Sequence, residues 1–155
     1  MYAIRKILVT TDFSDYSAAA LDYAISLADI HAADLHLLHV VEDQSKESGA
    51  KENVVRKNMQ KFVFEKVDEF TWVTQVIRRG HPHEEIVQYA RQQHIDLIVI
   101  ATHGRTGIAH VLMGSIAEKV IRYSPIPVLA VKPEAILEQL ITHEDVVHDL
   151  HIPAA

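Results

Sequence analysis

Three glycines and a serine lie close together between residues 104 and 115 of this sequence: Gly104, Gly107, Gly114 and Ser115. A phosphate group needs close approach to the backbone and N–H donors, and glycine has no side chain to obstruct that approach. An apolar helical pattern begins at Ser115, and a helix N-terminus presents N–H groups to an anion. This stretch therefore predicts a cradle for a phosphate-bearing ligand.

A second interpretation of the same residues is purely structural. Ser115 and Glu118 have the spacing of a capping box, in which the Ser hydroxyl and the Glu side chain satisfy the helix's own N–H groups. The glycines would then form only a tight loop. The dinucleotide pattern GxGxxG and the P-loop pattern GxxxxGK[ST] are both absent, so the loop alone leaves the two interpretations open.

The elements that must position this loop are visible as runs of apolar residues. Continuous runs rich in Val, Ile and Leu predict buried parallel strands at 6–10, 34–41, 71–78, 96–101 and 127–131. Helical spacing predicts helices at 14–31, 54–70, 82–94 and 115–123, with Ser14 as the cap of the first and Asp15 in its first turn. The polar stretch 42–53 is predicted to be a mobile loop.

Strands that alternate with helices require right-handed crossovers, which place helices on both faces of a parallel sheet. The predicted fold class is therefore α/β, a doubly wound three-layer sandwich around a five-stranded parallel sheet. In such sheets ligands bind outside the carboxyl ends of the strands. The residues that follow the first, second and fourth strands are 10–12, 40–41 and 101–104.

Composition narrows the class of protein. The chain has 155 residues and no Cys, and neither a signal peptide nor an apolar run of about 20 residues is apparent, so we expect a soluble cytoplasmic protein without a membrane partner. Its net charge is −6, which argues against a nucleic-acid partner although Gly104 to Gly107 mimics the GxxG loop of RNA-binding KH domains. Residues 133–155 hold five acidic residues and no Lys or Arg.

Two units are therefore expected. One domain covers 1–132, and an acidic extension that is partly helical or disordered covers 133–155. The extension contains His143, His148 and His151, which could hold a transition metal weakly, although a solvated tail is the simpler interpretation.

Three blocks of sequence resemble the universal stress protein family over residues 1–132: ILVTTDFS, LLHVVE and ATHGRTGIAHVLMGSIAEKVIRYSPIPVLAVKP. The pattern of the family's nucleotide-binding branch is Gly, two residues, Gly, nine residues, Gly, then Ser or Thr. This chain has Gly104, Gly114 and Ser115 at the later positions and Ala101 at the first. The resemblance implies an adenine nucleotide alpha hydrolase-like fold that binds ATP or AMP, with Mg²⁺ or Mn²⁺ as a companion of the phosphates.

Carried over residue by residue, the resemblance also implies a binding site. Residues 10–12 would lie beside the ribose and first phosphates, and Val40 would present its backbone to the adenine edge. Residues 100–104 would form the next part of the pocket wall around the ribose and phosphate. The amides of 114–117 would bind the phosphates. The implied contacts are Thr10, Thr11, Asp12, Val40, Ile100, Ala101, His103, Gly104, Gly114, Ser115, Ile116 and Ala117.

Two of these side chains allow more than one role. The Asp12 carboxylate can hold a divalent ion that bridges the phosphates, bond to the ribose, or cap the next helix. A bare carboxylate beside a phosphate would be repelled unless an ion or a hydroxyl lay between them, which favours the first two roles. His103 can donate to a phosphate or serve only as a surface or packing residue.

Three functions fit these observations. The first is a dimeric stress-response sensor or regulator that responds to adenine nucleotide; no catalytic residue is expected, because no Ser-His-Asp or paired-carboxylate arrangement surrounds the cradle. The second is a nucleotide-free dimeric scaffold, which Ala101 keeps open. The third is slow ATP hydrolysis or self-phosphorylation at Ser115 or a nearby Thr. A homodimer through strand 127–131 is expected in each case, because that edge would expose Val128, Leu129 and Val131.

Overall fold

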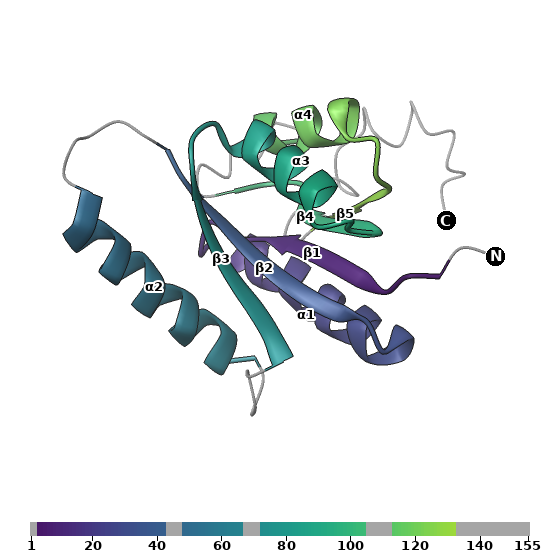
Figure 1. Cartoon of the computed structure of the whole chain (residues 1–155), viewed down its shortest axis with the longest axis horizontal. Coiled ribbons are helices and arrows are strands. Elements are labelled where there is room, and N and C mark those ends of the chain that lie inside the picture. The colour runs from purple at the N-terminus through teal and green to yellow at the C-terminus, as the bar shows by residue number, and fades with distance from the viewer. Residues whose placement is uncertain (1–2, 43–47, 67–71, 105–112, 133–155) are drawn as a thin grey trace, which may run out of the picture.

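The computed structural model describes residues 3–42, 48–66, 72–104 and 113–132 (Figure 1). The strands are β1 (Lys6–Thr10), β2 (Asp34–Val41), β3 (Val73–Arg79), β4 (Leu97–Ala101) and β5 (Val128–Val131). The helices are α1 (Asp15–His31), α2 (Ser48–Phe64), α3 (Pro82–Gln92) and α4 (Ser115–Tyr123). Within this described part, no helix combines the length and apolarity that a bilayer crossing requires.

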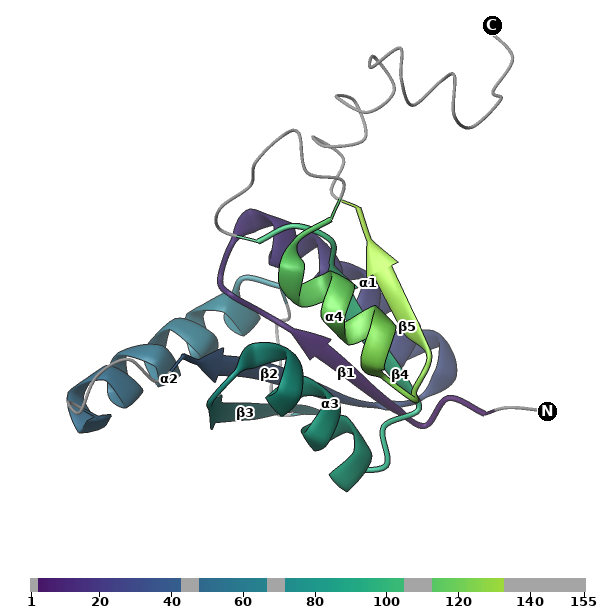
Figure 2. The ribbon, with the colours of Figure 1, turned by 90° about the horizontal axis from the view of Figure 1, so that it is seen from above.

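All five strands are parallel and lie in the order β3-β2-β1-β4-β5. The chain proceeds from β1 outward to β3, then crosses back to β4 on the other side of β1 (Figure 2). The direction of winding therefore reverses between β1 and β4, which is where open α/β sheets form their ligand crevice. The predicted doubly wound fold is confirmed.

Two apolar clusters form the layers on either side of the sheet. Alternate residues of β1 face opposite ways: Ile7 and Val9 pack with α1 and α2, whereas Leu8 packs with α3 and α4. All three side chains are fully buried. The sheet is thus covered on both faces, as its continuous apolar strands predict.

Helix α2 differs from the prediction. It begins at Ser48, not at residue 54, so the prediction of a loop over 42–53 is wrong for residues 48–53; the helix ends at Phe64, before the predicted residue 70. Only one stripe of α2, including Met59 and Val63, is buried in the core. Its first turns need no apolar periodicity because they include Ala50, Lys51 and Glu52, which are themselves good helix formers. Residues 67–71 lie outside the described residues.

The two ends of α1 show why this helix has the predicted bounds. The Ser14 hydroxyl accepts a hydrogen bond from the Ser17 amide at 3.2 Å, which confirms Ser14 as the cap, and Asp15 lies in the first turn. The helix ends at His31, and the left-handed backbone of the next residue, Ala32 (φ 50°), lets the Ala33 amide donate to the carbonyl of Ala28 at 2.9 Å.

The edge strand β5 is more enclosed than the sequence suggests. Val128 and Leu129 are half-buried beside β4, and Val131 is only 5% exposed. The expectation that this strand exposes Val131 is therefore wrong, because Val131 packs into the cluster beneath α1. Among the described strands, β5 pairs with β4 alone.

A buried polar pair links the sheet to α3. His36 on β2 is 8% exposed, and its Nδ1 lies 2.7 Å from the Tyr89 hydroxyl. The Arg78 guanidinium lies over the Tyr89 ring, 5.4 Å from its centroid. Burial lowers the pKa of His36, and the nearby charge of Lys6 lowers it further against a small opposing effect of Asp34.

This pair predicts a loss of stability in mild acid. Because burial lowers the pKa of His36 in the folded chain, the unfolded chain binds a proton at His36 more readily as the pH falls through the ordinary histidine value of about 6.5. Between pH 7.5 and 5.5, the wild-type protein should lose about 1 kcal/mol more unfolding free energy than His36→Gln, measured by urea denaturation. Equal losses in the two proteins would show that His36 does not contribute.

Candidate functional site

The turn that follows β1 is held in place by Thr11. Its amide donates to the Leu38 carbonyl at 3.0 Å, and its hydroxyl accepts from the Phe13 amide at 2.9 Å and lies 3.0 Å from the Ser17 hydroxyl. Thr11 is 6% exposed. Its side chain therefore fastens β1 to the start of α1, and the adjoining residue Asp12 is positioned rigidly at the carboxyl edge of the sheet.

Asp12 connects this turn to the loop after β4. One carboxylate oxygen, Oδ1, accepts hydrogen bonds from the Ser14 amide at 3.0 Å and from the Ser14 hydroxyl. Asp12 thus supports the capping residue, and Ser14, not Asp12, caps α1. The other oxygen, Oδ2, lies so close to Gly104 that a Cβ built there would be 2.7 Å away. Two loops far apart in sequence therefore meet at one carboxylate.

Thr102 anchors the end of β4. Its amide donates to the Val131 carbonyl at 2.9 Å, and its own carbonyl accepts from the Gly114 amide at 2.5 Å. The Thr102 hydroxyl lies 2.9 Å from Nδ1 of His103, whose side chain is 4% exposed. The interpretation of His103 as a surface residue is therefore wrong. Thr102 thus holds the start of α4 against the end of β4.

The N-terminus of α4 shows whether Ser115 and Glu118 form the predicted capping box. The N-cap residue is Gly114, which has no side chain, and Ser115 is the first helical residue. The Glu118 side chain instead pairs with Arg122 at 2.8 Å. The capping-box interpretation is therefore wrong, because the helix starts one residue too early for Ser115 to cap it. The amides of residues 115–117 have no side-chain cap from Gly114, and the positive end of the helix dipole lies there.

The close packing around Gly114 explains its residue type. A Cβ at this position would lie 3.2 Å from the Thr102 carbonyl and 3.8 Å from the His103 Cα. Since φ is −68°, the requirement is for space and not for an unusual backbone. The glycine thus allows the start of α4 to lie directly against the end of β4.

Four further residues predicted to contact a nucleotide, in β1, β2 and β4, have buried or half-buried side chains. Ile100 and Ala101 are 4% and 8% exposed, so their side chains belong to the core. Thr10 is the half-buried last residue of β1. The paired register of β1 and β2 ends at Thr10 and Leu38, so Val40 lies beyond the end of β1. The Val40 side chain packs against the core on the α3 side of the sheet.

Two aromatic side chains at this edge, those of His39 and Phe13, pack together without any signal in the sequence. The His39 Nδ1 lies 2.8 Å from the Thr11 carbonyl, which can only accept, so this nitrogen carries the proton. The His39 ring stacks on Phe13, with centroids 4.4 Å apart. Phe13 itself has a φ of 64°, uncommon for a bulky residue. No local pattern identifies this pair, because it depends on the register of β1 and β2.

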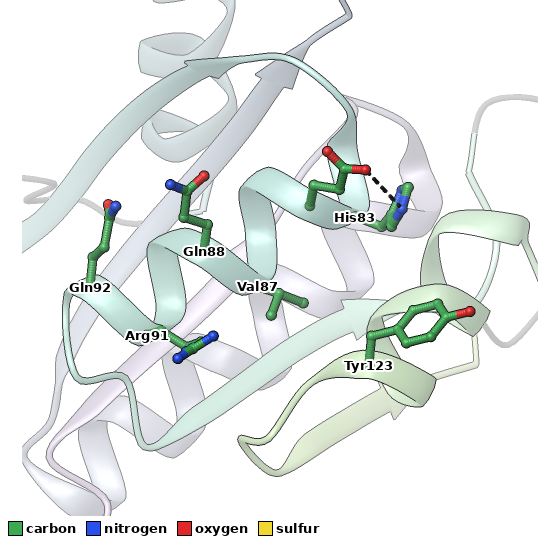
Figure 3. Close-up of a pocket in the computed structure, with 7 residues that line it drawn as sticks. His83, Val87, Gln88, Arg91, Gln92 and Tyr123 are labelled. Atoms are coloured by element: carbon green, nitrogen blue, oxygen red, sulfur yellow. Dashed lines mark ion pairs between the residues drawn. The ribbon is translucent and has the colours of Figure 1, made fainter.

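Two hollows in the described part of the chain lie away from these residues. A groove of about 710 Å³ lies along α3 and α4 (Figure 3), lined by His83, Glu84, Val87, Gln88, Arg91, Gln92 and Tyr123. A second hollow of about 410 Å³ adjoins the end of β3. Neither contains a predicted nucleotide contact. Residues 105–112, which connect the two halves of the candidate site, lie outside the described residues.

A glycine-capped helix beside the winding reversal of a parallel sheet is typical of α/β proteins that bind anions at the carboxyl edge of the sheet. The sequence profile of the universal stress protein family matches residues 3–132. The chain is also 30% identical over 153 residues to universal stress protein MJ0577 of Methanocaldococcus jannaschii, covering 83% of this chain and 94% of that protein. The chain belongs to the universal stress protein family.

Solved structures agree with this assignment and with the adenine nucleotide alpha hydrolase-like fold. The structure of MJ0577 covers 86% of this chain and 99% of its own, with a TM-score of 0.74 and 31% sequence identity. A universal stress protein in complex with cAMP covers 84% of this chain and 98% of its own, with a TM-score of 0.64 and 26% identity. The second of these proteins binds a cyclic adenine nucleotide at least in its crystal.

Proposed function

We propose that this protein binds an adenine nucleotide, ATP or AMP, at the carboxyl edge of its sheet. The observation that carries the proposal is the glycine-capped N-terminus of α4, held against β4 by the hydrogen bond from Gly114 to Thr102. Its first amides and its dipole favour a phosphate. The complex of a related universal stress protein with cAMP supports an adenine nucleotide as the ligand.

Each group at the edge has a role in this proposal. The amides of 115–117 bind phosphate, the backbone of residues 100–104 lies along the ribose, and Val40 meets the adenine edge with its backbone. His103 lies beside the phosphates. Because Mg²⁺ and Mn²⁺ usually retain several waters, one carboxylate and the phosphates together are a sufficient ligand set for either ion. Asp12 is the residue that would supply this carboxylate.

The biological role that follows is regulatory and not catalytic. Nucleotide occupancy would set the activity of a cytoplasmic stress-response sensor that dimerises through β5. Support for the dimer comes from the edge position of β5 among the described strands and from its half-buried Val128 and Leu129. The nucleotide-binding domain in this proposal is 1–132, and 133–155 is an acidic extension.

A calorimetric titration tests the proposal. AMP, ATP and cAMP are titrated separately into the purified protein, with and without Mg²⁺, and nucleotide released from denatured protein is identified by chromatography. Saturable binding of an adenine nucleotide is expected. Absence of binding and of released nucleotide would favour the nucleotide-free scaffold, and appearance of ADP or a phosphopeptide at Ser115 would favour the enzymatic alternative. Light scattering at micromolar concentration is expected to give the mass of a dimer.

A further inference from the structure

Both peptide groups that flank the Cα of Asp12 are held by hydrogen bonds. The peptide between Thr11 and Asp12 has its carbonyl 2.8 Å from Nδ1 of His39, which donates to it. The next peptide, between Asp12 and Phe13, has its amide 2.9 Å from the Thr11 hydroxyl, to which it donates. Peptide groups are planar, so restraining the plane on each side of a Cα restrains both of its backbone dihedral angles. These two hydrogen bonds therefore set the direction in which the Asp12 side chain leaves the backbone.

An aromatic stack supports the two hydrogen bonds. The His39 ring lies over the Phe13 ring, with centroids 4.4 Å apart and planes inclined by 29°. The Phe62 ring of α2 meets Phe13 edge-on, with centroids 5.8 Å apart. Aromatic pairs attract one another in both arrangements at such separations. All three side chains are half-buried. The stack thus joins β2, the turn after β1, and α2.

The backbone of Phe13 requires this support. Its φ of 64° lies in the left-handed region, which bulky residues rarely adopt because Cβ comes too close to a carbonyl oxygen. A backbone conformation that is unfavourable in isolation persists where the surrounding contacts determine it. The contacts of the Phe13 ring with His39 and Phe62 have this effect. They stabilise the turn in which the Ser14 amide reaches Oδ1 of Asp12 at 3.0 Å.

The orientation of Asp12 matters because its carboxylate meets a second loop. Oδ1 is bonded to Ser14, and Oδ2 lies against Gly104, where a Cβ would be only 2.7 Å away. A binding group must be held to within about 0.5 Å of its productive position. We infer that His39 and Phe13 are positioning residues of the nucleotide site, which act on the ligand by orienting the Asp12 carboxylate. This inference rests on the proposed binding of an adenine nucleotide.

Two substitutions at His39 separate its hydrogen bond from its ring. His39→Asn keeps an N–H donor near the place of Nδ1 and removes the ring, whereas His39→Phe keeps a ring and removes the donor. In calorimetric titrations with ATP and Mg²⁺, His39→Phe should bind about tenfold more weakly than the wild-type protein, as is usual when a supporting partner of a ligating carboxylate is lost. His39→Asn should stay within about threefold of wild type, because the bond to the Thr11 carbonyl is retained.

A substitution at Phe13 separates its ring from its backbone. Phe13→Gly adopts a φ of 64° without strain but removes the ring from the stack. If the ring holds the turn, the ATP affinity of this variant should also fall about tenfold. Wild-type affinity in Phe13→Gly would show that the left-handed backbone alone is sufficient.

A double-mutant cycle distinguishes positioning from a general loss of stability. In the Asp12→Ala background, where the amides of α4 should still give measurable binding, neither His39→Phe nor Phe13→Gly should lower the affinity further, because no carboxylate is left to orient. The matched control is Val63→Ala, which removes fully buried atoms from the core cluster that Phe13 packs against. It should lower the free energy of unfolding in urea and keep wild-type affinity.

The possible failures can be told apart. Wild-type affinity in both folded variants, His39→Phe and Phe13→Gly, would overturn the positioning role. Equal losses of affinity with and without the Asp12 carboxylate would also overturn it, since the two residues would then act on the ligand by another route. Either result, with ATP binding intact in the wild-type protein, leaves the proposed function standing. Absence of adenine-nucleotide binding in the wild-type protein would overturn the proposed function and this inference together.

Discussion

The variant Ser115→Asp is expected to bind AMP and ATP at least 100-fold more weakly than the wild-type protein. Its carboxylate would lie at the first position of α4, among the amides that the proposal assigns to phosphate, and would both occupy those donors and repel the ligand. Ser115 is exposed, and an acidic residue in the first turn stabilises a helix, so the fold should be retained. Calorimetry should register a loss of about 3 kcal/mol in binding free energy.

Two matched variants show whether the negative charge at position 115 causes the loss of nucleotide affinity. Gln60→Glu adds the same charge at an exposed position on α2 and should keep wild-type affinity. Ser115→Ala should weaken binding only a few fold, because the backbone amides remain. Wild-type affinity in Ser115→Asp, with normal thermal stability, would place the phosphates somewhere other than the start of α4.

The second large effect is expected at Gly104. A Cβ at this position would lie 2.7 Å from Oδ2 of Asp12, closer than real Cβ contacts, so in Gly104→Ala the carboxylate must move. We expect nucleotide affinity to fall about tenfold or more and the free energy of unfolding to fall by about 1–3 kcal/mol. Calorimetry and urea denaturation measure the two losses separately.

A double-mutant cycle with Asp12→Ala isolates this contact. If the methyl group acts by displacing the Asp12 carboxylate, Gly104→Ala should cost almost no additional stability in the Asp12→Ala background. Asp12→Ala alone should destabilise the protein, because the Ser14 amide and hydroxyl lose their acceptor. Strictly additive losses would mean that Gly104 is required for a reason unrelated to Asp12.

Much of this fold could be predicted because the central strands β1, β2 and β4 are largely apolar runs whose residues are mostly buried. The predicted 6–10 and 34–41 coincide with β1 and β2, and α4 has the predicted bounds of 115–123. The start of α2 could not be found in the same way. Its first turns carry polar residues that satisfy a helix as well as a loop, and no apolar periodicity distinguishes the two.

The parts of the candidate site that neighbouring residues form could be predicted from the sequence. The parts that depend on contacts between distant segments could not. Gly114 and the start of α4 could be identified from spacing, although the assignment of the N-cap to Gly114 or Ser115 could not. The contact of Asp12 with Gly104 and the stacking of Phe13 on His39 join segments about 25 to 90 residues apart, and both require the register of the sheet. His39 shows no signal of its own within β2.

The most direct test is a nitrogen-15 NMR titration of the protein with AMP. Saturable shifts are expected, and they should be largest at the amides of Ser115, Ile116 and Ala117, since those groups would gain a phosphate acceptor. The amide of Gly114, already bonded to Thr102, should shift less. Saturable binding that leaves the three amides unchanged would show that the phosphate does not bind at the start of α4.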